Sequence, residues 1–256
     1  MMKKLVTILA LATACLSAPV MAETVKLGSD FTYPPFNYKN EQQVPVGFDI
    51  EIAEALCAEA KLDCEWVTMG WDGLIPGLLS RKIDVIMASM RITEDRQKRV
   101  LFTDRYYKTP AQFAGRSDRT FDVSAEGLKG LNIGVQRGTI HDTYISDKFG
   151  NDVNILRYDG QAEVYMELVN ERLDLVFANS DQLALSFLNT EDGKAFEFVG
   201  KPVTDEAYVG KGTALALRKR DTDLAEKFNA AIATIRANGT YDEIAEKYFN
   251  FDIYGD

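Results

Sequence analysis

The sequence predicts an α/β protein built of two lobes, and three of its features indicate this. Short β-rich runs alternate with helix-like amphipathic runs, an order that implies parallel strands with helices on the faces of the sheet. The same alternation starts again near residue 131 and gives a second unit of similar size. A late strand and two helices have no unit of their own to complete, so we expect them to return to the first lobe.

The first unit alternates strands and helices over residues 25–102. Its first helix has apolar side chains along one face, namely Ile50, Ile52, Ala53, Leu56 and Cys57. We expect strands at 25–28, 65–69 and 83–88, helices at 49–60 and 74–79, and an extended run at 100–102.

The second unit repeats this order between residues 112 and 188. An extended run at 112–115 leads into strands at 131–136, 153–158 and 173–178, which alternate with helices at 139–149, 162–171 and 180–188. The elements left over are a strand at 213–217 and helices at 223–237 and 241–248.

Their return to the first lobe makes the chain cross between the lobes twice, near Pro110 and near Asp205. The predicted division is 23–110 plus 206–256 for lobe 1 and 111–205 for lobe 2. Two crossing strands form a hinge, and ligands of open α/β sheets bind at the carboxyl ends of the strands. A ligand-binding cleft between the lobes follows.

Residues 1–22 have the features of a cleaved export signal. Lys3 and Lys4 form a basic start, and the apolar run of ten residues that follows is too short to span a bilayer. Small residues at 19–22 suit cleavage before Glu23, so we expect the mature protein in the periplasm. Cys15 leaves a lipoprotein alternative open, although Leu11 fits such a signal poorly.

The mature chain is strongly acidic. The whole chain has a formal net charge of −10, and removing the signal leaves 27 basic against 39 acidic residues, a net charge of −12. Such a charge disfavours nucleic acid and anionic membranes as partners.

Two cysteines remain after cleavage, Cys57 and Cys64. An even pair at close spacing in an exported protein favours a disulfide over two reduced thiols. The bridge would join the helix at 49–60 to the strand that follows it. Because the loop is short, we expect it to contribute about 2–3 kcal/mol.

Residues 88–96 have the features of a carboxylate clamp. Thr93 suits the cap of a short helix, with Glu94 and Asp95 in its first turn. Free backbone N–H groups at such a junction attract an anion, and the guanidinium of Arg96 matches the geometry of a carboxylate. The alternative is an ordinary loop with a solvated arginine.

Several short sequence motifs of the mature chain occur in the same order as in one protein family. They are 30–36 (DFTYPPF), 47–53 (GFDIEIA), the Cys57/Cys64 spacing, 71–76 (WDGLIP), 89–96 (SMRITEDR), 102–104 (FTD), 239–241 (GTY) and 247–255 (KYFNFDIYG). On these strings the chain resembles the periplasmic amino-acid-binding proteins of ABC importers, with the lysine/arginine/ornithine and histidine binders nearest.

The resemblance implies the type II periplasmic binding protein fold, with a mainly parallel sheet in each lobe and a two-strand hinge. It also implies a monomer that binds an amino acid or a derivative without chemistry, needs no cofactor or metal, and docks on a membrane permease.

The family's binding residues carry over one at a time. Arg96 matches its carboxylate-binding arginine, Ser89 a serine at the ligand's amino group, and Asp30 an acid at a cationic side-chain end. Tyr33 and Trp71 match ring contacts along the ligand. Ala88 lies beside Ser89, and Thr139 falls on the anion-facing turn of the second lobe.

Three positions depart from the family pattern. Asn179 stands where relatives have an aspartate for the α-ammonium, Arg91 replaces a serine, and His141 stands where glutamine is usual. The first two changes make the pocket more positive by two charges. Each residue also has a structural interpretation: Arg91 in solvent, Asn179 as a helix cap, and His141 on a helix surface.

Two ligand classes therefore stay open. One is a basic amino acid such as arginine, lysine or histidine. The other is an opine-like derivative with a cationic end and two carboxylates, whose second carboxylate would meet Arg91.

The rival function is an enzyme on the same fold, such as a cyclohexadienyl dehydratase. A single histidine disfavours most His-dependent catalytic sites. The chain also lacks a Gly-x-Ser-x-Gly elbow, a phosphate-binding P-loop and a His-Glu-x-x-His motif. We therefore expect a binding protein and no catalytic residues.

Overall fold

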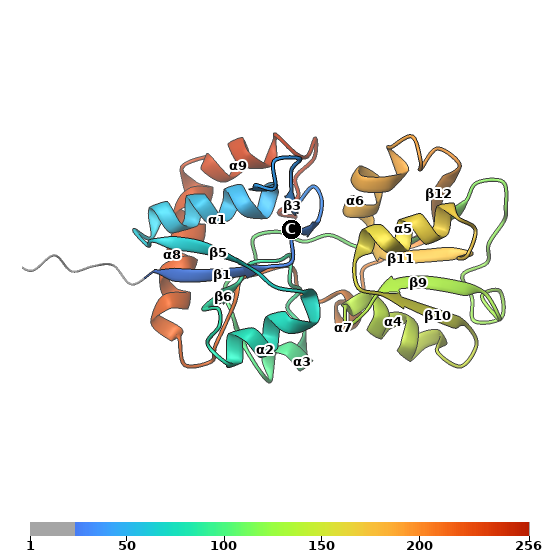
Figure 1. Cartoon of the computed structure of the whole chain (residues 1–256), viewed down its shortest axis with the longest axis horizontal. Helices are drawn as coiled ribbons and strands as arrows, with labels where there is room; N and C mark the ends of the chain where they lie inside the picture. The colour runs from blue at the N-terminus through green and yellow to red at the C-terminus, as the bar shows by residue number, and fades with distance from the viewer. Residues whose placement is uncertain (1–23, 256) are drawn as a thin grey trace, which may run out of the picture.

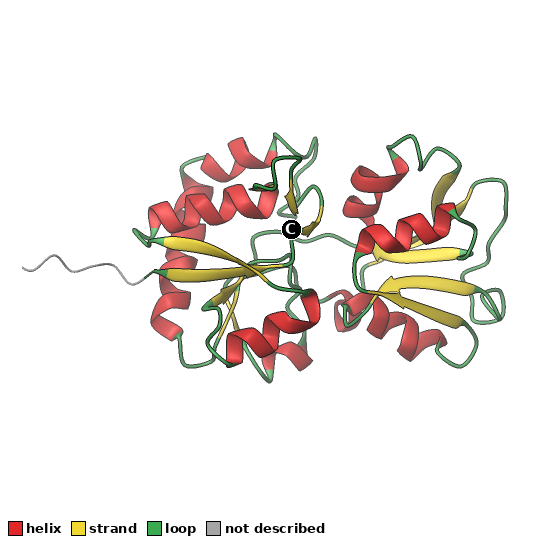
Figure 2. Ribbon diagram, in the orientation of Figure 1, coloured by secondary structure: helices red, strands yellow, loops and turns green. Residues whose placement is uncertain are grey.

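Two sheets of five strands each, flanked by helices, lie side by side as two lobes (Figure 1). This computed structural model describes residues 24–255. The predicted signal at 1–22 and Cys15 lie outside the described residues. Helices lie above and below the strands of each lobe (Figure 2), which confirms the predicted α/β class.

The first sheet confirms that the late strand returns to lobe 1. Its strand order is β5-β1-β6-β13-β7. The first three are parallel, and β13 runs antiparallel to both of its neighbours. The bounds are β1 Val25–Ser29, β5 Cys64–Thr68, β6 Val85–Ile86, β7 Leu101–Phe102 and β13 Ala216–Leu217. The expected strand at 83–88 is thus only two residues long.

Helices α1 (Phe48–Glu59), α8 (Thr222–Ala237) and α9 (Thr240–Ala245) pack against one another in lobe 1. Their shared core is rich in rings, among them the fully buried Phe36, Phe48 and Tyr106. On the other side lie η1 (Trp71–Gly73), α2 (Leu74–Leu79) and α3 (Glu94–Gln97). A small sheet that was not predicted consists of β2 (Thr32–Tyr33), β3 (Asn37–Lys39) and β4 (Pro45–Val46).

The second sheet has the order β10-β9-β11-β8-β12. Strands β9 (Asn132–Gln136), β10 (Asn154–Tyr158) and β11 (Leu175–Asn179) are parallel. Strands β8 (Ala111–Arg116) and β12 (Phe196–Val203) are antiparallel to their neighbours. The helices are α4 (Ile140–Phe149), α5 (Gln161–Val169), α6 (Ser180–Leu183) with the π-helical η2 (Ala184–Leu188), and α7 (Glu206–Val209).

Four of the five strands in each sheet run in one direction, which confirms the mainly parallel sheets we predicted, and only β13 in the first sheet and β8 in the second run against them. The reversal of these two strands follows from the route of the chain. Strands β8 and β13 enter their sheets directly from a crossing between lobes, without the helix that a parallel connection needs. The sequence analysis missed β12 and α7.

The two crossings run side by side. Tyr107 in the first and Thr213 in the second form an antiparallel bridge, and Thr213 also pairs with Arg91. The strands of each sheet fall on the expected sides of Pro110 and Asp205, while the lobe boundaries themselves stay a prediction.

The lobes also touch across the cleft. The indole nitrogen of Trp71 in lobe 1 donates a hydrogen bond of 3.2 Å to the carbonyl oxygen of Gly138 in lobe 2. The hydroxyl of Ser186 donates to the carbonyl oxygen of Pro34. These contacts define a closed arrangement of the lobes.

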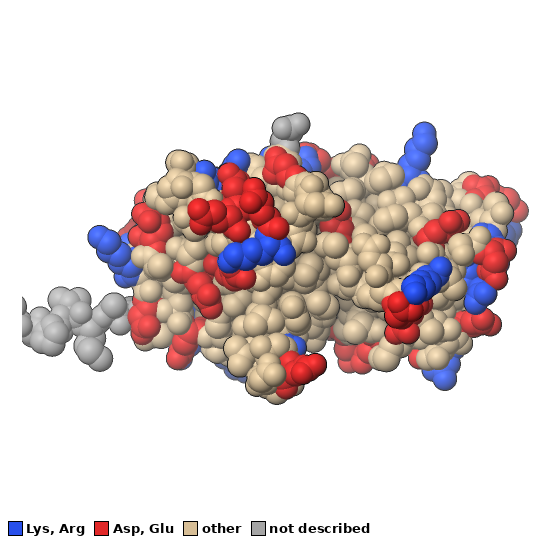
Figure 3. All heavy atoms as spheres, turned by 90° about the horizontal axis from the view of Figure 1, so that it is seen from above, with Lys and Arg blue, Asp and Glu red and all other residues tan. Residues whose placement is uncertain are grey.

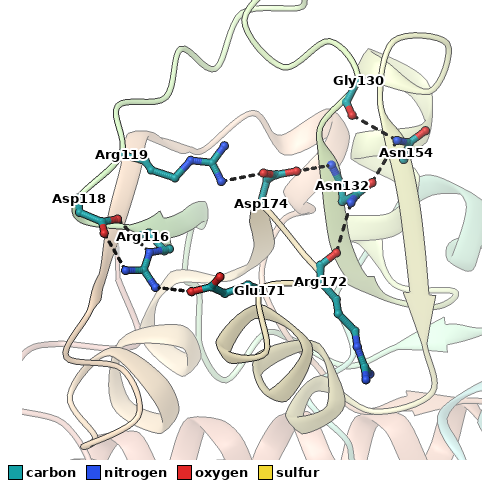
Figure 4. A network of polar contacts seen from close by, with 9 residues as sticks. All are labelled: Arg116, Asp118, Arg119, Gly130, Asn132, Asn154, Glu171, Arg172 and Asp174. Carbon is teal, nitrogen blue, oxygen red and sulfur yellow. Dashed lines mark hydrogen bonds and ion pairs between the residues drawn. The ribbon is translucent and has the colours of Figure 1, made fainter.

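The two ends of the second sheet differ in chemistry. Near the amino ends of β9 and β11, the ion pair Arg116–Glu171 joins the end of β8 to a loop, and Arg119–Asp174 joins two loops (Figure 4). Such exposed pairs contribute at most about 1 kcal/mol each. The carboxyl ends of the same strands, at Gln136 and Asn179, face the cleft instead. Acidic side chains lie over both lobes on the face drawn in Figure 3.

The predicted disulfide is confirmed: Cys57 on α1 is bonded to Cys64 at the start of β5. The bridge ties the end of helix α1 to the amino end of strand β5. Neither Ser89 nor Arg96 belongs to these two elements.

Breaking this bridge should destabilise the protein without altering its binding site. We expect Cys57→Ala with Cys64→Ser to lower the free energy of unfolding by about 2–3 kcal/mol, because the closed loop is short. Urea unfolding followed by circular dichroism measures this, with the affinity for ligand as the control. An unchanged unfolding midpoint would contradict it.

Candidate functional site

All ten residues predicted to bind ligand line one cavity between the lobes. They are Asp30, Tyr33, Trp71, Ala88, Ser89, Arg91, Arg96, Thr139, His141 and Asn179, and Gln136 and Ile140 complete the lining. The free space is about 30 Å³, room for about two water molecules. The closed lobes and the lining side chains therefore nearly fill the cavity, so a ligand needs the lobes to part.

Arg96 is held at the start of α3. Thr93 caps this helix, because its hydroxyl accepts a hydrogen bond of 3.3 Å from the Arg96 backbone N–H. The guanidinium donates to the carbonyl oxygen of Arg91 at 3.1 Å and lies 5.3 Å from the ring centre of Trp71. Burial and the charge of Arg91 lower the pKa of Arg96 to about 10. Arg96 is therefore cationic at neutral pH.

The hydroxyl group of Ser89 is oriented by a buried carboxylate. Its backbone lies in the left-handed region, with φ 54°, and its hydroxyl donates to Asp49 at 2.8 Å. Because the proton points to Asp49, the oxygen lone pairs remain free to accept a further hydrogen bond.

Behind Ser89, Asp49 is fully buried and accepts two further hydrogen bonds of 2.8 Å, from Asn37 and from the Tyr106 hydroxyl. Burial raises the pKa of Asp49 to about 6 in spite of these donors. The sequence analysis noted the string that contains Asp49 but gave this residue no role.

Asp30 follows β1 and accepts a hydrogen bond of 2.9 Å from the Thr32 hydroxyl. Burial raises its pKa, and hydrogen bonds from Thr32 and from the Gln136 amide in lobe 2 oppose the rise. Tyr33 lies next to it and stacks on Phe36 with 5.7 Å between ring centres. A carboxylate and a ring thus lie beside each other in lobe 1.

Thr139 lines the second-lobe side of the cavity. It caps α4: its oxygen accepts from the Asp142 backbone N–H at 3.3 Å, and its hydroxyl donates to the Gln136 carbonyl at 2.8 Å. The first turn of α4 therefore borders the cavity with its N–H end, where an anion is stabilised.

The structural interpretation of Arg91 as a solvated side chain is wrong. Arg91 is only 4% exposed, and its Nη2 donates to the hydroxyl of Thr109 in the first crossing. The guanidinium lies 5.7 Å from the ring centre of Tyr107. The bridge between Arg91 and Thr213 holds the backbone against the hinge and turns the side chain inward.

The capping interpretation of Asn179 is confirmed, and Asn179 also lines the cavity. Its Oδ1 accepts from the backbone N–H groups of Asp181 at 2.9 Å and Gln182 at 3.1 Å. Its Nδ2 donates to Thr109 at 2.6 Å. Every polar atom of this side chain is therefore engaged within the protein.

His141 does not lie on a helix surface: it is 7% exposed and lines the cavity. The alternative fails because the first turn of α4 faces lobe 1. Its ring packs edge-on against Phe177, and its Nε2 is buried without a hydrogen-bond partner. Burial, Arg91 and Arg96 lower the pKa of His141 to about 3, so the imidazole is neutral.

Sequence reasoning missed Gln136, Ile140 and Thr109. Gln136 ends a correctly predicted strand, so the rule that site residues follow strand ends could have found it. Thr109 has no such signal, because its role depends on Arg91 and Asn179 meeting at the hinge. Among residues 24–255, no cluster of three His, Cys, Asp or Glu could hold a metal ion.

The fold and the cavity define a two-lobed binding protein. Residues 25–251 match the model of the bacterial extracellular solute-binding proteins, family 3, and the chain belongs to this family. None of the helices within the described residues is long and apolar enough to cross a membrane.

Named relatives extend over the whole chain. It is 46% identical to the L-arginine-binding protein of Pseudomonas aeruginosa, covering 99% of each chain. It is 39% identical to the histidine-binding periplasmic protein of Escherichia coli, over 99% of this chain and 100% of that one. An ancestral arginine-binding protein bound to arginine has a TM-score of 0.81 and 33% identity, over 89% of this chain and 98% of that chain.

The raised pKa of Asp49 predicts a pH-dependent contribution to stability. An acid with a folded-state pKa of about 6 and an ordinary pKa of 3.8 stabilises the fold fully at low pH, and this contribution is lost as the pH rises through 6. The unfolding free energy of wild type minus that of Asp49→Asn should fall by roughly 2 kcal/mol between pH 4 and pH 7. Urea unfolding at constant ionic strength measures it; a difference that does not vary with pH would refute it.

Proposed function

We propose that this protein is the periplasmic binding component of an ABC importer for amino acids with a cationic side chain. One observation carries this: a single interlobe cavity contains both Arg96 and Asp30, and neither forms an ion pair within residues 24–255. A zwitterion with a cationic end supplies the missing partner of each. Arginine, lysine and ornithine, named for two of the relatives, have this pattern of charge, and histidine, named for another, has it when its imidazole is protonated.

Binding starts on lobe 1. Arg96 binds the ligand carboxylate, the lone pairs of Ser89 accept from its amino group, and Asp30 meets the cationic end. Tyr33 and Trp71 pack along the stem between these charges. These groups come from segments of one lobe, so the open protein offers most of the site before the lobes close.

Closure then adds the second lobe. Thr139 and the first turn of α4 reach the carboxylate, and the Trp71–Gly138 hydrogen bond forms across the cleft. Because the second lobe can contact a ligand held on lobe 1 only when the lobes approach, the contacts from Thr139 and α4 shift the equilibrium toward closure.

The proposed contacts supply enough free energy for micromolar binding. A micromolar complex needs about 8 kcal/mol. A few hydrogen bonds to charged groups, at about 1.5–3 kcal/mol each, together with ring packing, reach this after the costs of association.

The closed monomer would present both lobes to a membrane permease, which then receives the ligand. Export through a signal cleaved before Glu23 places it in the periplasm, in keeping with the names of its relatives. The proposed division is lobe 1 (23–110 plus 206–256) and lobe 2 (111–205), with α7 just past the second boundary packing on α4 of lobe 2.

The enzyme alternative is not favoured. The relatives named above are binding proteins. In addition, a pKa of about 3 makes His141 a very weak general base.

Removing the guanidinium of residue 96 should abolish tight binding. For Arg96→Met we expect the Kd for L-arginine to rise at least about 30-fold, because the variant loses charge-assisted hydrogen bonds. Titration calorimetry on protein freed of bound ligand by unfolding and refolding gives the Kd. The control is Arg99→Met, an exposed arginine of the same segment; an Arg96→Met protein that binds like this control would exclude the proposed site.

Asp30 should select for the cationic end. We expect Asp30→Asn to weaken L-arginine binding at least about tenfold, and L-citrulline binding much less, because citrulline carries no side-chain charge. The exposed Asp104→Asn serves as the control in the same assay. Equal losses of affinity for both ligands would show that Asp30 does not distinguish a charged side chain from an uncharged one.

A further inference from the structure

Arg91 is a buried cation whose hydrogen-bonding capacity is only partly used. A guanidinium has five N–H donors. Nη2 donates to Thr109, but Nη1 is buried without any partner. No carboxylate in the described part of the chain forms an ion pair with Arg91. Because this side chain lines the cavity, its unused donor is available to a bound molecule.

A second unpartnered polar atom lies in the same cavity, the Nε2 of His141. The neutral imidazole can donate one hydrogen bond from this nitrogen without bringing in a further charge. Arg91, Arg96 and His141 all line this cavity. Donors on both lobes therefore converge on a region that lacks an acceptor.

The charge of the lining favours a second negative group. Asp30 is the one acidic residue among the twelve lining residues, against Arg91 and Arg96. A bound basic amino acid, with a net charge of +1, therefore gives the lining residues and the ligand together a net charge of +2. One additional carboxylate on the ligand lowers this net charge by one.

The hydrogen bonds of Asn179 indicate which atom of the ligand bears the second carboxylate group. Both polar atoms of its side chain are engaged, by the cap of α6 and by Thr109. It therefore offers no acceptor to a free α-ammonium, which carries three donors. A ligand nitrogen that already bears a substituent has fewer donors to satisfy.

We propose that Arg91 and His141 form a subsite for a second carboxylate. The preferred ligand is then a basic amino acid whose α-nitrogen carries a carboxylate-bearing substituent. The inference rests on the proposed function, since it uses Arg96 for the α-carboxylate and Asp30 for the cationic end. The substituent is either a carboxyalkyl group on a secondary amine or a carboxyacyl group on an amide.

Calorimetry with three probes tests this on the mature protein. Octopine is arginine with a carboxyethyl group on the α-nitrogen, N-succinylarginine carries a carboxyacyl group there, and L-arginine carries neither. We expect at least one of the first two to bind tenfold or more tighter than L-arginine. Which one it is distinguishes a secondary amine from an amide.

The variant Arg91→Gln retains an amide donor for Thr109 and removes the charge. It should lower the affinity ratio of the better dicarboxylate probe to L-arginine at least tenfold, whereas the exposed Arg99→Gln should leave this ratio unchanged. Thermal unfolding of both variants shows whether they are folded. An unchanged ratio in folded Arg91→Gln overturns the subsite.

The histidine gives an independent readout, because His141 is the one histidine of the chain. In tag-free protein, its imidazole NMR signals should move more with the dicarboxylate probe than with L-arginine. Equal shifts overturn the part assigned to His141.

Two failures are distinguishable. If L-arginine binds tightly through Arg96 and neither dicarboxylate probe binds better, the subsite is wrong and the proposed function holds. If no probe binds, or if binding is indifferent to Arg96→Met, both fail. Tight binding of L-glutamate alone would show a second carboxylate site without a cationic end, and would overturn the ligand class.

Discussion

Two guanidinium groups, those of Arg91 and Arg96, lie in one interlobe cavity, and neither forms an ion pair with a carboxylate of the described residues. Placing two like charges in a poorly solvated space is costly, because the low dielectric strengthens their repulsion. The protein offsets part of this cost with ring faces, Tyr107 under Arg91 and Trp71 under Arg96. Under the proposed function, a bound anion lowers the remaining repulsion, and this reduction favours binding.

The hinge is part of this site. Thr109 belongs to the first crossing, and its hydroxyl accepts from Arg91 of one lobe and from Asn179 of the other. One oxygen on the hinge therefore fixes a charged group and a helix cap at the same time. This arrangement links the cavity residues Arg91 and Asn179 to the relative position of the lobes, because a shift of either lobe alters the geometry at Thr109.

A buried polar network supports the lobe-1 face from behind. Asp49 accepts from Asn37, Tyr106 and Ser89, and so sets which way the Ser89 hydroxyl points. Fully connected networks of this kind rigidify a site, whereas one missing partner leaves a costly unsatisfied group. The stability and the polarity of the binding face thus depend on the same carboxyl group.

The sequence by itself determined the α/β class, most helices and strands, the disulfide and the ten residues that line the cavity, because periodicity, cysteine spacing and family strings are local features. It placed helix α2 at its observed bounds, Leu74–Leu79. Only the tertiary structure decided the antiparallel strands, the inward turn of Arg91, the burial of His141 and the roles of Thr109 and Gln136. These depend on contacts between segments far apart in the chain, such as Arg91 with Thr213 and Asn179 with Thr109, and no local pattern encodes which distant group a side chain meets.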